Sequence, residues 1–211
     1  MRRSFTTFLA TCLATCLAPG GLIVGALLSA CASAPAENFY ALTAEAPPAT
    51  ARDASGPSVS VGAVNLAEIF DRPQLVIQIA DHRVLILEQQ RWAQPLASEI
   101  QRVMALNLAR QLDTSFDPER RSAATGRAMD AVIRVALDVQ RFDSIVGKDV
   151  NIELRWTVRT GDDEPRSGRS VATEPVAAPG YDAIVAAHSR ALARISREIA
   201  DAVMRARNKG N

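Results

Sequence analysis

Cysteine is scarce in this 211-residue sequence, and all three cysteines lie within the first 31 residues. Cys12 and Cys16 belong to an apolar stretch that we expect to be removed, and Cys31 is the one cysteine that would then remain. Because a disulfide needs two cysteines, we expect the folded part to be stable through packing alone. An excess of charge is also missing, since 24 basic residues face 23 acidic ones. This balance argues against a nucleic-acid-binding protein, which would carry a strong basic excess.

The motifs of several common enzyme classes are missing too. The sequence contains no Gly-x-Ser-x-Gly elbow, no Gly-x-x-x-x-Gly-Lys phosphate loop and no His-Glu-x-x-His pair. Its two histidines, His82 and His188, are far apart, and no metal-ligand spacing surrounds either of them. His188 falls on the apolar stripe of a predicted helix, which favours a buried or boundary residue. We therefore predict no catalytic residue, no metal and no cofactor.

The first thirty residues have the pattern of an export signal. Arg2 and Arg3 precede an apolar run over residues 8–28, and small residues follow it. A positive start, an apolar core and a small-residue cleavage site are typical of a secretory signal peptide. The alternative is an uncleaved transmembrane helix of about 20 residues, but Pro19-Gly20-Gly21 would break it.

The end of this stretch resembles the bacterial lipobox, with Leu28, Ser29 and Ala30 before Cys31. In a lipobox the cysteine thiol receives a diacylglyceryl group, the chain is cut before the cysteine, and the new amine is acylated. Several acyl chains are needed for lasting anchorage, because one chain binds a membrane only marginally. Residue 32 is Ala rather than Asp, which resembles the pattern sorted to the outer membrane. We therefore predict an outer-membrane lipoprotein facing the periplasm of a Gram-negative bacterium.

The remaining chain has the length of one domain. We predict a signal peptide at 1–30, a lipidated Cys31 with a short tether at 31–37, a single domain at 38–206 and a tail at 207–211. Without residues 1–30 the formal charge is −1, since only Arg2 and Arg3 are lost from the 24 basic residues.

Hydrophobic periodicity predicts the elements of that domain. Alternating apolar residues indicate strands near 39–42, 58–64, 75–79, 84–87, 133–139, 150–158 and 167–174, and residues 43–57 and 113–128 are predicted to be mainly loop. Helical spacing predicts helices from Pro95 to about Leu112 and over 181–206. We expect an α/β fold, in which a mixed, largely antiparallel sheet of six or seven strands packs with two long helices as an αβ sandwich.

Several short motifs resemble a known family. They are Tyr40-Ala41-Leu42, Asp71-Arg72-Pro73-Gln74-Leu75-Val76, Arg91-Trp92-Ala93-Gln94-Pro95-Leu96 and Asn107-Leu108. Their order and spacing behind a lipobox resemble the ABC-type transport auxiliary lipoproteins of the PqiC type. The long, Pro-rich 43–57 segment departs from that pattern, and no motif after residue 112 can be matched.

The resemblance implies a role in lipid transport. Members of this family accompany systems built from an inner-membrane component and an MCE-domain protein, which move phospholipids or other hydrophobic molecules between the two membranes. It implies a non-enzymatic protein that docks the periplasmic assembly at the outer membrane. A homo-oligomer is compatible with such a role, because a conduit needs a rim, and the charge balance predicts no nucleic-acid partner. Two alternatives stay open: a lipid carrier with its own apolar cavity, and an outer-membrane assembly or structural lipoprotein.

Some motif residues have either a docking or a structural interpretation. These are Asp71, Arg72, Pro73, Arg91, Trp92 and Pro95. Trp92 is expected mainly to pack the start of the helix against the sheet, and Asp71-Arg72-Pro73 to form a turn or a docking loop. Asn107 should be hydrogen-bonded on an apolar face. Arg120, Arg121 and Arg127 make one loop basic, and a solvated loop is the simpler explanation.

Overall fold

The structure, a computed structural model, describes residues 36–45, 58–116, 132–161 and 163–207. The chain divides into two compact units, Met1–Ala36 and Glu37–Asn211, and all the helices and strands given below belong to the second. Within the described ranges, no helix combines the length and apolar character needed to cross a membrane.

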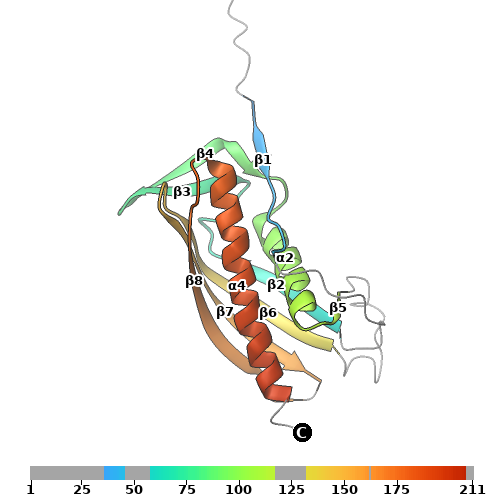
Figure 1. Cartoon of the computed structure of the whole chain (residues 1–211). Coiled ribbons are helices and arrows are strands. Elements are labelled where there is room, and N and C mark those ends of the chain that lie inside the picture. Colours follow the sequence, from blue (N-terminus) through green and yellow to red (C-terminus); the bar gives the residue numbers. More distant parts are fainter. Residues whose placement is uncertain (1–35, 46–57, 117–131, 162, 208–211) are drawn as a thin grey trace, which may run out of the picture. The chain divides into compact units, whose positions relative to one another are not determined.

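A five-stranded mixed sheet forms the larger layer (Figure 1). Its order is β5 (Ser115–Phe116), β2 (Ser58–Leu66), β6 (Val132–Ser144), β7 (Asp149–Thr160) and β8 (Arg166–Pro175). β6, β7 and β8 are consecutive antiparallel strands, whereas β2 lies parallel to both β5 and β6. Successive side chains of a strand point to opposite faces, so the alternation in β6 and β7 buries one face of the sheet. A register shift between Val139 and Arg141 changes this phase and places Phe142 in the core.

A second, three-stranded sheet has the order β1 (Asn38–Tyr40), β4 (Arg83–Trp92) and β3 (Gln74–Ala80). β3 and β4 form an antiparallel hairpin, and β1 pairs parallel to the last residues of β4. The two sheets meet where Gln78 forms an isolated bridge to Ile145 and accepts a hydrogen bond from the Val146 N–H at 3.3 Å.

Two helices, α2 (Leu96–Gln111) and α4 (Tyr181–Arg207), cover one face of the larger sheet. α2 packs on β2, α4 packs on β7 and β8, and the helices pack on each other (Figure 1). Leu192, Ile195 and Ile199 of α4 are completely buried, as are Ile152 and Leu154 of β7. Burial of the apolar stripe of each helix against the sheet therefore holds this layered fold together.

The predicted α/β fold class is confirmed, and three details differ from the prediction. The prediction placed all strands in one sheet, but the described strands divide between two sheets. The division arises because β3 meets the β6–β7 turn at a single bridge instead of pairing along its length. The two-residue strand β5 was also missed, inside a segment predicted to be loop. Pro95 lies at the N-cap of α2, one residue before the helix, and its carbonyl accepts the Ser98 and Glu99 N–H groups.

Candidate functional site at the tether end

Four segments that are distant in sequence lie at the end of the domain that residues 37–40 enter (Figure 1), and we call this region the tether end. They are residues 37–40, the tip of the β3–β4 hairpin (79–85), the β6–β7 turn (145–148) and residues 176–181, which lead from β8 into α4. The Val176 N–H donates to the Lys148 carbonyl at 3.0 Å. The Tyr181 ring meets the Tyr40 ring edge to face, with centroids 6.5 Å apart. The first residues of the domain are thus packed directly against the start of α4.

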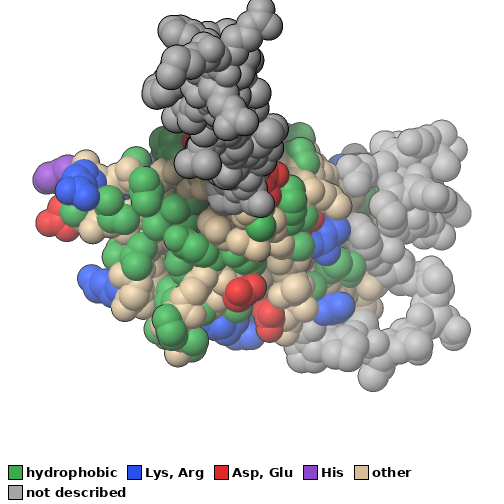
Figure 2. Space-filling view, turned by 90° about the horizontal axis from the view of Figure 1, so that it is seen from above, with side chains coloured by type: hydrophobic (Ala, Val, Ile, Leu, Met, Phe, Trp, Pro, Cys, Tyr) green, Lys and Arg blue, Asp and Glu red, His purple; other side chains and the backbone are tan. Residues whose placement is uncertain are grey.

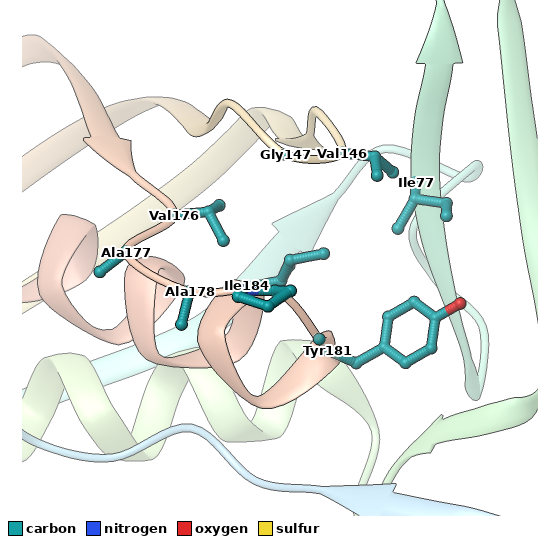
Figure 3. A pocket seen from close by; sticks show the side chains of 10 residues that line it. Ile77, Val146, Gly147, Val176, Ala177, Ala178, Tyr181 and Ile184 are labelled. Carbon is teal, nitrogen blue, oxygen red and sulfur yellow. The ribbon is translucent and has the colours of Figure 1, made fainter.

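An apolar groove of about 640 Å³ opens between β3, the β6–β7 turn and the start of α4 (Figure 3). Its lining includes Ile77, Val146, Val176, Tyr181 and Ile184, together with residues 177–180. None of the described lining residues is charged, and the Tyr181 hydroxyl is their one polar side-chain group. Gly180 has a φ of 105°, a conformation that suits glycine and lets the chain turn into α4 at the groove wall. The groove has the volume of a small-molecule site and a surface suited to hydrocarbon.

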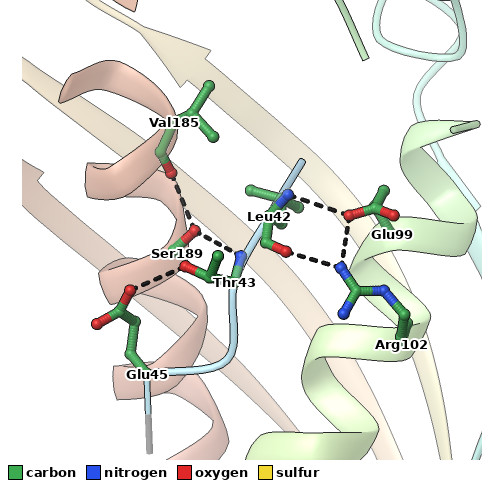
Figure 4. A network of polar contacts seen from close by, with 7 residues as sticks. All are labelled: Leu42, Thr43, Glu45, Glu99, Arg102, Val185 and Ser189. Atoms are coloured by element: carbon green, nitrogen blue, oxygen red, sulfur yellow. Dashed lines mark hydrogen bonds and ion pairs between the residues drawn. The ribbon is translucent and has the colours of Figure 1, made fainter. Parts of the chain in front are cut away.

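Directly after β1, the chain runs between α2 and α4 and is bound by both helices (Figure 4). The Leu42 N–H donates to Glu99 Oε2 at 3.0 Å, and the Leu42 carbonyl accepts from Arg102 Nη2 at 2.7 Å. Glu99 and Arg102, one turn apart in α2, form an ion pair of 2.7 Å. Glu99 is only 2% exposed, so Arg102 and the Leu42 N–H compensate its buried charge.

The other side of this segment is bound to α4. The Thr43 N–H donates to Ser189 Oγ at 3.1 Å, and the Ser189 hydroxyl donates to the Val185 carbonyl at 3.0 Å. We call Glu99, Arg102 and Ser189 the clamp. Because side chains from both helices bind the backbone of Leu42 and Thr43, this segment is attached to α2 and α4 together.

Tyr40 adds a contact within the small sheet. Its hydroxyl donates to Gln90 Oε1 at 2.6 Å, and its carbonyl accepts from the Ala93 N–H at 2.8 Å. Burial raises the pKa of the Tyr40 hydroxyl above its ordinary value, and the Asp182 carboxylate raises it further. The hydroxyl therefore keeps its proton at neutral pH and remains a donor.

A buried aromatic group lies behind the groove and joins the two sheets to α4. The Phe142 ring stacks on the His188 ring with centroids 4.0 Å apart, and both Trp92 and Phe70 meet Phe142 edge to face. His188 Nε2 lies 2.8 Å from Ser144 Oγ. Burial lowers the pKa of His188 to about 3, so the imidazole is neutral at physiological pH. His188 is 1% exposed, which matches the buried residue predicted for the apolar stripe.

The motif residues named in the sequence lie close together at the junction of the small sheet and α2. The Trp92 N–H donates to the Pro73 carbonyl at 2.7 Å, which ties the Asp71-Arg72-Pro73 turn to the end of β4. Arg91 pairs with Glu37 at 2.7 Å, at the first residues of the domain. Trp92 is 7% exposed, so its ring is packed inside and not presented on the surface.

Other predicted residues lie outside the described ranges. These are the lipobox residues Leu28, Ser29, Ala30 and Cys31 and the basic loop residues Arg120, Arg121 and Arg127. Sequence reasoning missed the clamp entirely. One signal was available, since Glu99 falls on the apolar stripe of its helix between Leu96 and Val103, where a carboxylate needs a partner. In the part of the chain that the structure describes, no three His, Cys, Asp or Glu side chains gather as a metal site would require.

The family model of the ABC-type transport auxiliary lipoprotein component matches residues 40–200. The chain belongs to this family. The suspected resemblance is thereby confirmed, and the matched range contains β1's last residue, the clamp and the whole groove. Comparison with the curated proteins finds no match.

Solved structures support the fold of this auxiliary lipoprotein. An uncharacterized protein is 20% identical with a TM-score of 0.64, covering 80% of this chain and 99% of its own. A Xanthomonas campestris protein is 21% identical with a TM-score of 0.56, covering 77% of this chain and 92% of its own. At such identities the likeness concerns the fold alone.

Proposed function

We propose that the chain is a non-enzymatic outer-membrane lipoprotein, anchored through an acylated Cys31, that docks the MCE-domain protein of an ABC-type lipid-transport system. Membership of the transport auxiliary lipoprotein family supports the transport part of this proposal. The observation that carries the positional part is the clamp, which binds Leu42 and Thr43 between two helices. Only residues 32–41 separate Cys31 from that clamped position.

The mechanism that follows is positional. Acyl chains would hold one end of the tether in the leaflet, and the clamp would pass that restraint to both helices and the sheet. A partner bound to the domain would then be kept at a set distance from the membrane. Once Cys31 is acylated, no other residue needs to change its covalent state for this role, which agrees with the auxiliary description of the family.

The first experiment tests the anchor through Cys31→Ala in cells supplied with radiolabelled palmitate. We expect the variant to lose the label and to leave the membrane fraction, while Cys16→Ala, within the predicted signal, keeps both. Unchanged label and fractionation in Cys31→Ala would refute the anchor.

The second experiment isolates the acylated protein with its partners after crosslinking. An MCE-domain protein among them supports docking, whereas a β-barrel assembly would replace this proposal with the assembly-factor alternative.

A second candidate, a lipid carrier, is favoured by the 640 Å³ apolar groove. A carrier would enclose its cargo, and it would retain that cargo without an anchor. Mass spectrometry of the purified Cys31→Ala protein separates the two functions. A bound phospholipid at about one molecule per chain supports the carrier, and a lipid-free domain that still binds the MCE-domain protein supports docking.

A further inference from the structure

The exposed apolar side chains of this protein are concentrated at the tether end. Across the described residues, eight large hydrophobic side chains are exposed, and five of them lie there. They are Phe39 at 61%, Val146 at 52%, Val84 at 56%, Leu85 at 45% and Ile79 at 41%. Figure 2, which looks onto this end, shows hydrophobic side chains gathered over it with charged ones toward its edges. Single exposed apolar residues need no explanation, but a group next to an apolar groove does.

The outer face of the five-stranded sheet is different in character. Glu153 pairs with Arg169 at 2.8 Å, and Thr157 is hydrogen-bonded to Ser167 at 2.9 Å. This face therefore carries paired polar side chains that suit contact with water. The apolar tether end is a local feature and not a general property of the surface.

Beside its turn, where Asp81, His82 and Arg83 are exposed, the β3–β4 hairpin presents apolar side chains on both of its faces. Leu85 lies opposite Ile77, on the face that continues into the groove, whereas Val84 lies opposite Gln78, on the other face. A hairpin that packed on a protein surface would need only one apolar face, because strand side chains alternate. A tip surrounded by hydrocarbon would use both faces.

Chain length indicates what lies against this surface. Six residues separate Cys31 from Asn38, where β1 begins, and the seven Cα-to-Cα steps between them span at most about 25 Å when extended. Given the proposed acylation of Cys31, on which this inference rests, the tether end stays within that distance of the lipid. The surface nearest the bilayer would then be the apolar one.

We propose that the tether end is a membrane-contact face, in which Val84 and Leu85 beside the hairpin turn and Val146 insert into the phospholipid leaflet that holds the anchor. Arg83 and Lys148, both exposed beside these apolar residues, lie where they can meet lipid phosphates. Asp81 and Asp182 are exposed at the same end, so the face has no excess of positive charge. Apolar insertion is therefore the main interaction, and contact should persist at high salt and on zwitterionic lipid.

The test uses the acylated protein in phosphatidylethanolamine–phosphatidylglycerol vesicles that contain doxyl-labelled phospholipid. Once Cys31 is acylated and residues 1–30 are removed, an introduced cysteine is the single free thiol. Leu85→Cys and Val84→Cys each place an environment-sensitive fluorophore on one face of the tip. Arg159→Cys is the matched control, since its exposed position near the end of β7 lies about 30 Å along the strand from the β6–β7 turn.

We expect blue-shifted emission and several-fold stronger doxyl quenching at both tip positions than at the control, with little change in 0.5 M salt, a concentration that screens charges beyond about 4 Å. Equal quenching at tip and control positions would overturn the membrane-contact face. A blue shift without doxyl quenching would also overturn it, and would indicate a second copy or another protein on this surface. Failure of the anchor gives a different result, because a protein lacking the acyl chains does not float with the vesicles and exposes a second reactive thiol.

Discussion

His188 should make the domain lose stability as the pH falls below 6.5. Its ring is completely buried, and burial lowers its pKa in the folded state to about 3 from an ordinary value of 6.5. Above pH 6.5 the imidazole is neutral in both states and contributes no pH dependence. Between pH 6.5 and 3 this histidine is protonated in the unfolded chain but stays neutral in the folded chain, so the free energy of unfolding decreases as the pH falls.

The two pKa values set the size of this effect. Each pH unit between them corresponds to about 1.4 kcal/mol, so the loss from pH 8 to pH 5 is about 2 kcal/mol. That is a large part of the stability of a small domain. The window from pH 8 to pH 5 lies above the range in which most carboxylates titrate, so the histidine contribution can be measured there.

The perturbation that removes this effect is the double variant Ser144→Ala with His188→Phe. Phenylalanine keeps a planar ring against Phe142, and removing the Ser144 hydroxyl avoids a buried polar group without a partner. Urea unfolding followed by tryptophan fluorescence at pH 8, 6.5 and 5 gives the free energies. The control is His82→Gln, in the exposed β3–β4 turn, which should keep the loss of stability.

Two results would refute the reasoning about His188. The first is a wild-type stability that does not change between pH 8 and pH 5. The second is a double variant whose free energy of unfolding falls by about 2 kcal/mol between pH 8 and pH 5, as in the wild type, since the titrating group would then lie elsewhere.

Three further predictions concern the clamp and the core. Glu99→Ala should lower the free energy of unfolding in urea by about 2–3 kcal/mol, because the buried Leu42 N–H loses its charged acceptor. Removal of the exposed Glu198 is the control and should cost under about 0.5 kcal/mol, and equal losses in the two variants would contradict the clamp. Gly168→Ala should cost about 1–3 kcal/mol and alter tryptophan fluorescence, since its Cβ would overlap the Trp156 ring; an unperturbed variant would show that the ring can move freely. Ile152→Ala, at a completely buried position, should lower the free energy of unfolding by about 2–5 kcal/mol in the same urea assay, and a smaller loss would mean that the core refills the space.

The elements that repeat with a clear period could be predicted from the sequence. The alternation in β6 and β7 and the helical stripe of α4 both match the structure closely. Each pattern reflects geometry within a single element, because strand side chains repeat every two residues and helix side chains every 3.6. β5 has only two residues, so no period could reveal it.

The clamp could not be predicted in the same way. Leu42 is 57 residues from Glu99, and Thr43 is 146 residues from Ser189. The local pattern of residues 40–45 does not indicate that either helix binds this segment. Only the buried position of Glu99 on its stripe showed that a partner for that carboxylate was required.

The sequence by itself determined which of the longer segments are strands and helices, and it carried the lipobox pattern at Cys31 and the motifs that resemble the family. The tertiary structure decided that the strands form two sheets, that one segment lies between two helices, and that the apolar tip, turn and groove share one end. The physical reason is the range of the interactions. Periodicity follows from the geometry of neighbouring residues, whereas sheet division and the tether end depend on packing between segments that are far apart along the chain.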